Sequence, residues 1–129
     1  DVAIMVAAVA DWRADNQSGQ KIKKKGAAPA PLKLTENPDI LAGLAQSDQR
    51  PALLIGFAAE TEKVAEHAQA KLKRKACDWI VANDVSGDVM GGADNSVHII
   101  THSGNEMWER LPKPEVARRL VAKISEEFA

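Results

Sequence analysis

Three lysines at alternate positions, Lys21, Lys23 and Lys25, form a dense run of like charge. If this stretch is extended, the three side chains share one face at spacings of about 6.6 Å. Each adjacent pair then repels by roughly 0.6 kcal/mol in water, so the face suits an anion such as a phosphate. The alternative is a solvated loop, the usual state of an isolated run of charge. A nucleic-acid patch would interleave aromatic residues for stacking, and none occur here.

Two further lysines, Lys71 and Lys75, lie four positions apart in a predicted helix over 62–76 and therefore share one face of it. The apolar stripe of this helix places both side chains at its margin. They are either part of an anion site or simply cations that the dipole favours near a helix C-terminus.

The triplet Asn37-Pro38-Asp39 predicts the start of a helix over 38–46, with Asn37 as the cap and Pro38 at the first helical position. Free N–H groups at such a start suit an anionic or polar ligand. Equally, Asn37 and Asp39 could do no more than cap and balance the helix.

Other types of chemistry have little support in the sequence. His67, His98 and His102 show no metal-ligand spacing, and Cys77 precedes an apolar run, as a small core residue does. No serine or cysteine nucleophile motif is present. An enzyme built from these residues would rely on positioning and on the stabilisation of charge.

The elements that must position these residues alternate along the chain. Apolar runs predict buried strands, helical periodicity separates them, and Thr61 is the predicted cap of the second helix. This order indicates an α/β fold with a largely parallel sheet and an antiparallel hairpin at one edge. The predicted elements are strands 2–9, 51–58 and 78–82; extended pieces 20–25 and 31–35; helices 38–46 and 62–76; a hairpin of 97–101 with 106–108; and a helix from Pro114 with Ala117, Leu120, Val121, Ile124 and Phe128 inward.

Ligands of such sheets bind beyond the carboxyl ends of the strands. Residues 7–11, 57–61 and 83–86 should therefore converge at one edge, joined there by the start of helix 38–46. This convergence predicts a single site.

Composition narrows the class of protein. The chain has 129 residues and a net charge of −1, which favours one domain and argues against a general nucleic-acid binder. One cysteine excludes an intramolecular disulfide, and no apolar run reaches the roughly 20 residues of a membrane span. We expect a cytoplasmic protein. Because the chain opens on an apolar strand, we also expect residues 1–129 to be the C-terminal part of a longer domain.

Five blocks occur along the chain: Ala7-Ala8-Val9-Ala10-Asp11-Trp12, Lys21-Ile22-Lys23-Lys24, Asn37-Pro38-Asp39-Ile40, Gly56-Phe57-Ala58-Ala59-Glu60-Thr61 and Ala82-Asn83-Asp84-Val85-Ser86. Together they resemble phosphopantothenoylcysteine synthetase, in particular the synthetase half of the bacterial bifunctional decarboxylase/synthetase. The blocks follow the family's order and cover nearly the whole chain. Each block alone is weak, but the combination is specific.

The resemblance implies a Rossmann-like, three-layer fold, a homodimer and a two-step ligase reaction of coenzyme A biosynthesis. CTP and 4′-phosphopantothenate form an acyl-cytidylate and pyrophosphate, with Mg²⁺ as the metal. L-Cysteine then displaces CMP to form the amide. The family's phosphate loop and its decarboxylase half, which uses FMN, have no counterpart in these residues, so we expect the fragment alone to be inactive.

The resemblance also assigns site residues. Lys21 and Asn83 are the implied catalytic residues, Asp84 is a further contact on the substrate side, and Asp11 lies at the ribose or the metal. The implied nucleotide-binding residues are Met5, Val6, Ala7, Asp11, Lys21, Pro38, Asp39, Ile40, Leu41, Phe57, Lys71 and Lys75.

The long polar segment 20–35 carries Leu32 and Leu34 but too few apolar residues to pack alone. We predict that it is an arm through which two copies of the protein pair. A noncatalytic nucleotide-binding module and a scaffold or dimerisation fragment remain the alternatives to a ligase.

Overall fold

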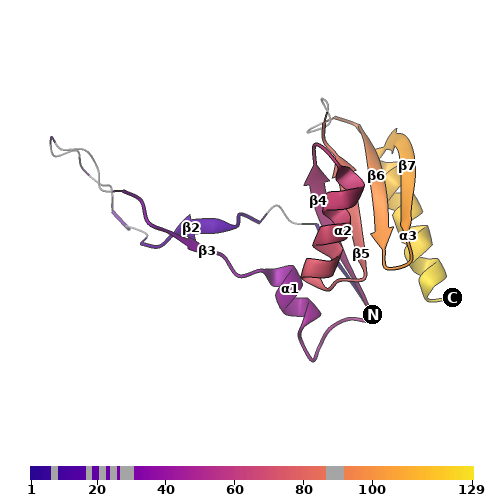
Figure 1. Cartoon of the computed structure of the whole chain (residues 1–129), viewed down its shortest axis with the longest axis horizontal. Helices are drawn as coiled ribbons and strands as arrows, with labels where there is room; N and C mark the ends of the chain where they lie inside the picture. Colours follow the sequence, from indigo (N-terminus) through magenta and orange to yellow (C-terminus); the bar gives the residue numbers. More distant parts are fainter. Residues whose placement is uncertain (7–8, 17–18, 21–22, 24–25, 27–30, 87–91) are drawn as a thin grey trace.

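The sheet confirms the α/β prediction. The computed structural model describes residues 1–6, 9–16, 19–20, 23, 26, 31–86 and 92–129. Its main sheet has five strands in the order β1-β4-β5-β6-β7 (Figure 1). The first three are parallel, and the last two join as an antiparallel hairpin at one edge. The strands are β1 (Val2–Met5), β4 (Leu53–Glu60), β5 (Trp79–Asp84), β6 (Asp94–Thr101) and β7 (Asn105–Pro112).

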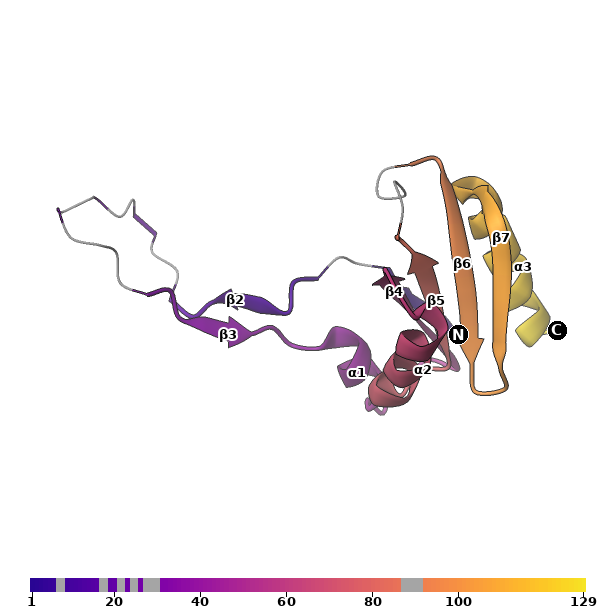
Figure 2. The same ribbon diagram turned by 45° about the horizontal axis from the view of Figure 1, so that its top comes forward.

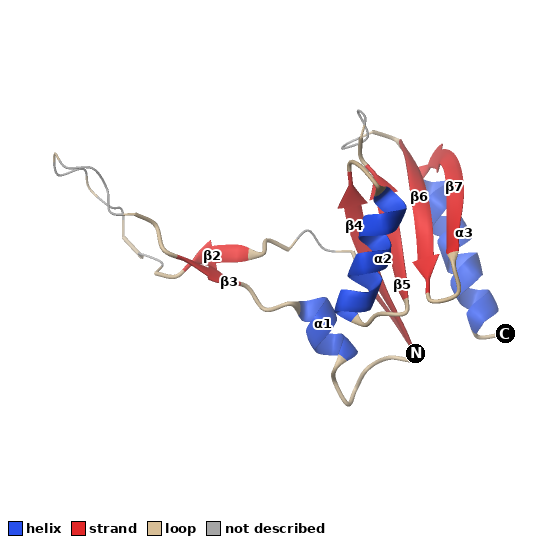
Figure 3. Ribbon diagram, viewed as in Figure 1, coloured by secondary structure: helices blue, strands red, loops and turns tan. Residues whose placement is uncertain are grey.

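Helices cover both faces of the sheet, which gives three layers (Figure 3). Alternate residues of each central strand point to opposite faces. One face packs on α2 (Val64–Lys75) and α1 (Ile40–Ala45), and the other packs on α3 (Lys113–Glu127). The first core contains Leu54, Ile80, Ile100 and Leu72, and the second contains Ile55, Val81, Ile99 and Leu120.

The first strand is shorter and less buried than expected. β1 ends at Met5 and, among the described strands, pairs with β4 alone, so it lies at the edge of the sheet. Ile4 and Val6 are 42% and 60% exposed. The prediction of a buried strand over 2–9 is therefore wrong in extent, because an apolar run does not say how far the chain follows its neighbour.

A separate two-stranded hairpin projects away from the sheet (Figures 1 and 2). It pairs β2 (Trp12–Ala14) with β3 (Leu34–Glu36), so the second predicted extended piece is only partly confirmed. The sequence did not predict β2, and most of the other predicted extended piece, 20–25, lies outside the described residues. Three pairs of residues hold the ladder, and Leu32 and Leu34 are 72% and 55% exposed.

Two predicted helix starts are wrong. Asp39, not Asn37, is the N-cap of α1, and its side chain accepts a hydrogen bond from the Ala42 N–H. α2 begins after Lys63, which has a φ of 45° and makes no side-chain cap, so Thr61 does not cap this helix. Asn37 and Asp39 are both of residue types that cap helices, and the turn of the chain decides between them. Before α2 the positive φ of Lys63 moves the start of the helix beyond Thr61.

α3 turns a slightly different face inward than predicted. Val116 and Leu120 are buried, whereas Val121 and Phe128 are 59% and 52% exposed and Ala117 is exposed.

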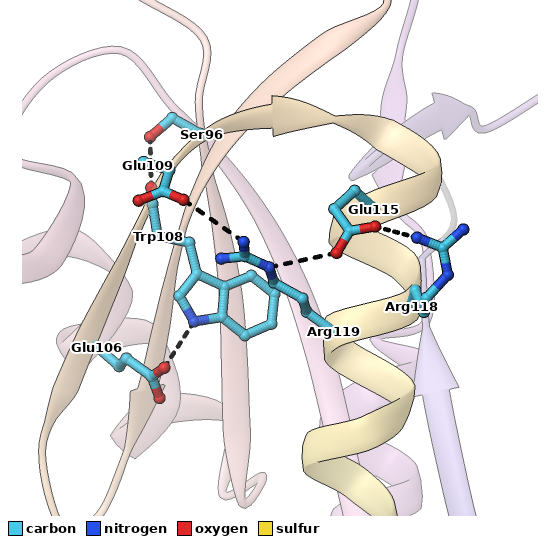
Figure 4. A network of polar contacts seen from close by, with 7 residues as sticks. All are labelled: Ser96, Glu106, Trp108, Glu109, Glu115, Arg118 and Arg119. Atoms are coloured by element: carbon cyan, nitrogen blue, oxygen red, sulfur yellow. Dashed lines mark hydrogen bonds and ion pairs between the residues drawn. The ribbon is translucent and has the colours of Figure 1, made fainter.

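The first turns of α3 are tied to β7 by the polar contacts in Figure 4. Arg119 bridges Glu109 and Glu115 at 3.5 Å each, and Arg118 also pairs with Glu115. On β7 itself, Trp108 Nε1 donates to Glu106 at 2.7 Å, and Ser96 of β6 donates to the Trp108 carbonyl at 3.0 Å.

No helix within the described ranges combines the length and the apolar content that a membrane crossing needs.

Cys77 is confirmed as a core residue: it is fully buried, and burial raises the pKa of its thiol.

Candidate nucleotide site

A cavity of about 440 Å³ lies beyond the end of β1, between β4, the start of α1 and the last turns of α2. Of the loops expected to converge beyond the carboxyl ends of the strands, residues 9–11 and Phe57 line this cavity, but residues 83–86 do not. Most residues assigned to the nucleotide meet here. The lining is Met5, Val9, Ala10, Asp11, Trp12, Glu36, Asn37, Pro38, Asp39, Ile40, Leu41, Phe57, Lys71 and Lys75.

Gly56 sets how closely α1 approaches the sheet. A Cβ at this position would lie 2.6 Å from Leu41 Cδ2 and 3.0 Å from Ile80 Cδ1. Real Cβ contacts of 2.6 Å essentially do not occur. The missing side chain therefore lets Leu41, and with it the first turn of α1, rest against β4 and form one wall of the cavity.

Asp39 joins the two helices across the cavity. One carboxylate oxygen accepts from the Ala42 N–H at 3.0 Å, and the other pairs with Lys75 of α2. The hydrogen bond from Lys75 and then the one from Ala42 lower the pKa of Asp39 below its ordinary value. Lys75 is thus partly neutralised, and an anionic ligand would compete with Asp39 for it.

Lys71 lies one turn earlier on the same face of α2. Its Nζ donates to the carbonyl oxygen of Phe57 at 3.0 Å, which anchors the side chain at the β4 wall. An ammonium group has three donors, and this bond uses one of them. Lys71 therefore brings a fixed positive charge to the cavity with donors left for a ligand.

The other wall is a cross-strand network that the sequence did not reveal. Asn37 donates from Nδ2 to the Ala10 carbonyl at 2.7 Å, and its backbone N–H donates to the Asp11 carbonyl at 2.7 Å. Arg13 Nη1 donates to the Asn37 side-chain oxygen at 3.0 Å and to the Glu36 carbonyl at 2.8 Å. The sequence predicts Asn37 as a helix cap and does not predict these contacts, because the partners of Asn37 lie far earlier in the chain.

Three assigned residues lie elsewhere. Val6 follows β1 and does not line the cavity. Asn83 is the last residue but one of β5, where its side-chain oxygen accepts from Asn95 Nδ2 at 2.9 Å. Asp84 accepts from the hydroxyl and the N–H of Ser86, and these bonds lower its pKa. The structure does not bring these residues into the cavity, and the catalytic role of Asn83 stays a prediction.

Lys21 and Ala7 lie outside the described residues, so their assigned roles also stay predictions. Within the described ranges, no group of three or more histidine, cysteine, aspartate or glutamate side chains could hold a metal. Asp11 nevertheless lines the cavity. Mg²⁺ commonly uses one or two carboxylates together with substrate phosphates, and a single Asp11 fits that mode of binding.

The chain is similar to known proteins over almost its whole length. The chain is 39% identical over 128 residues to the coenzyme A biosynthesis bifunctional protein CoaBC of Haemophilus influenzae, covering 98% of the chain and 32% of that protein. It is 42% identical over 129 residues to CoaBC of Escherichia coli K12, with 96% and 32% covered. The chain thus spans about a third of the length of these relatives.

A solved structure shows the same fold. The crystal structure of the C-terminal domain of CoaBC matches with a TM-score of 0.74 and 34% identity, covering 99% of this chain and 55% of that one. A family model described as the DNA/pantothenate metabolism flavoprotein C-terminal domain matches residues 1–128. The chain therefore belongs to the family of DNA/pantothenate metabolism flavoprotein C-terminal domains.

Proposed function

We propose that the protein containing this chain is a phosphopantothenate–cysteine ligase of coenzyme A biosynthesis that uses CTP. In the proposed reaction the carboxylate of 4′-phosphopantothenate attacks the α-phosphate of CTP, and pyrophosphate leaves. The amine of L-cysteine then attacks the acyl-cytidylate, and CMP leaves. The observation that carries this proposal is the cavity in which most of the residues assigned to the nucleotide lie together.

The walls suit a nucleoside triphosphate. Lys71 and Lys75 contribute positive charge from α2, and in this proposal backbone groups of Met5 and of the start of α1, both in the lining, read the edge of the base. Attack on a phosphate builds negative charge on its oxygens, and we assign the stabilisation of that charge to Lys21, whereas Lys71 and Lys75 bind the nucleotide. In a shielded cavity such charges act more strongly than in water.

Asp11 would hold Mg²⁺, which neutralises triphosphate charge when it is bound. Asp11 is exposed at the mouth of the cavity, and its carbonyl oxygen is bonded to the Asn37 N–H. The protein therefore presents this carboxylate from a backbone that is tied to the start of α1.

The test uses the complete protein with 4′-phosphopantothenate and either CTP or ATP, and it measures the release of pyrophosphate. We expect release with CTP and much less with ATP, and amide formation when L-cysteine is added. Equal release with both nucleotides would refute the base selectivity. A protein that binds CTP without releasing pyrophosphate would be a nucleotide-binding module, and one that binds no nucleotide would be a scaffold.

Substitution of the lysines separates their roles. Lys71→Ala should raise the KM for CTP and leave kcat unchanged, as expected when binding is lost equally in the ground and transition states. Lys73→Ala is the matched control, because Lys73 is an exposed residue of α2 that does not line the cavity. Lys21→Ala should lower kcat by about 10²-fold or more. If Lys21→Ala changes KM alone, its proposed role in the transition state is wrong.

A further inference from the structure

The mouth of the cavity is formed by two stretches of chain that have little else to hold them. Residues 9–12 leave the sheet, residues 36–39 return to it, and both line the cavity. Beyond them the β2–β3 ladder has only three pairs of residues, and Trp12 and Leu34 are about half exposed. Side-chain hydrogen bonds must therefore supply much of the order that burial supplies elsewhere in the fold.

Arg13 and Asn37 provide those bonds in one connected chain. A guanidinium carries donors only, so the Asn37 amide must turn its oxygen towards Arg13. The amide nitrogen then faces the Ala10 carbonyl, to which it donates at 2.7 Å. The flipped amide would oppose donor to donor on one side and acceptor to acceptor on the other. Arg13 and the Ala10 carbonyl thus hold the Asn37 amide in the same orientation from its two sides.

Asn37 acts on the cavity at two points. Through its side chain and its N–H it bonds the carbonyls of Ala10 and Asp11, two consecutive residues of the lining. Pro38 and the cap Asp39 follow Asn37 directly. Because the φ of a proline is fixed, the position of Asn37 also determines where α1 starts. Arg13 itself does not line the cavity.

We propose that Arg13 is a positioning residue: by orienting Asn37, it holds Asp11 and the start of α1 at the spacing that admits a nucleotide. This inference rests on the proposed function for the identity of the ligand, CTP. The ordering of residues 9–12 and 36–39 by Arg13 does not depend on that function, because it can be measured in the protein without ligand.

The experiment compares Arg13→Met with Arg110→Met in the complete protein. Arg110 is a matched control, because it is an exposed strand arginine that pairs with Asp94 at 3.8 Å and lies away from the cavity. Arg13→Met should raise the KM for CTP about five- to tenfold at unchanged kcat. Hydrogen-exchange mass spectrometry should show faster exchange over 36–40. Arg110→Met should do neither.

Conservative variants test the mechanism. Arg13→Lys keeps the charge but not the planar fork, so it should restore only part of the affinity. Asn37→Leu removes the Arg13–Asn37 bond from the other side but leaves the bond from Arg13 to the Glu36 carbonyl, so adding Arg13→Met to it should have a smaller effect than in the wild type. Unchanged exchange over 36–40 in Arg13→Met, a fall in kcat alone, or additive effects in the double variant would overturn the inference. If the parent protein does not use CTP, the proposed function fails and the exchange result alone decides the role of Arg13.

Discussion

Gly56 offers a sharp test of how the fold forms the cavity. In Gly56→Ala the new methyl group would meet Leu41 Cδ2 at 2.6 Å, so Leu41 must retreat by nearly an ångström to reach ordinary contact. Overpacking of this kind costs about 1–3 kcal/mol. Replacing a strand glycine also reduces the conformational freedom of the unfolded chain, which stabilises the folded protein by up to about 1 kcal/mol. We therefore expect a net loss of about 1 kcal/mol for Gly56→Ala and about 3 kcal/mol for Gly56→Val, which adds two methyl groups to a Cβ that already meets Leu41 and Ile80.

The assay is urea unfolding of the complete protein, followed by the fluorescence of the buried tryptophans Trp79 and Trp108. CTP affinity is measured alongside, because displacement of Leu41 moves a wall of the cavity. Gly43→Ala is the control: this glycine lies in α1, and a Cβ added there would meet nothing within 4 Å. The change should stabilise the helix by about 0.5–1 kcal/mol.

A double variant identifies the contact responsible. Leu41→Ala in the Gly56→Val background opens space for the new side chain. The free energy of unfolding lost in the double variant should therefore be smaller than the sum of the losses in the two single variants, by about 1 kcal/mol or more. Wild-type stability and affinity in Gly56→Val, or simple additivity with Leu41→Ala, would refute the close approach of α1 to β4.

Three further predictions concern stability and assembly. Asp39→Asn should destabilise the protein at neutral pH, and its difference from wild type should vanish as the pH falls below 3.8. The reason is that the lysine partner lowers the pKa of Asp39 in the fold, so the stabilisation is present above the unfolded value and is lost as the carboxylate protonates. Asp78→Ala should cost about 2 kcal/mol in urea unfolding, because Asp78 accepts from Arg50 and from the Leu54 N–H; Asp48→Ala, an exposed control, should cost little. A Leu32→Glu, Leu34→Glu variant should abolish the proposed pairing of arms in light scattering and lower activity, whereas a fully active dimer would show that the arm is a surface loop.

Local patterns in the sequence were sufficient for the central sheet. Strands β4 and β5 are apolar runs, and burial on both faces leaves such runs little freedom to be anything else. Phe57, Lys71 and Lys75, which only the resemblance to a family assigned to one site, line the same cavity, and their role there stays a prediction.

Tertiary structure decided the polar contacts. The pairing of β2 with β3 and the Asp39–Lys75 ion pair join residues that lie far apart in the sequence, and the choice of Asp39 as cap was made among equivalent neighbours. Arg13 and Asn37 likewise look like an ordinary surface arginine and a helix cap until the two stretches are side by side. Hydrophobic periodicity is a local property of the chain, whereas a hydrogen bond requires two atoms within about 3 Å, and only the folded backbone sets that distance.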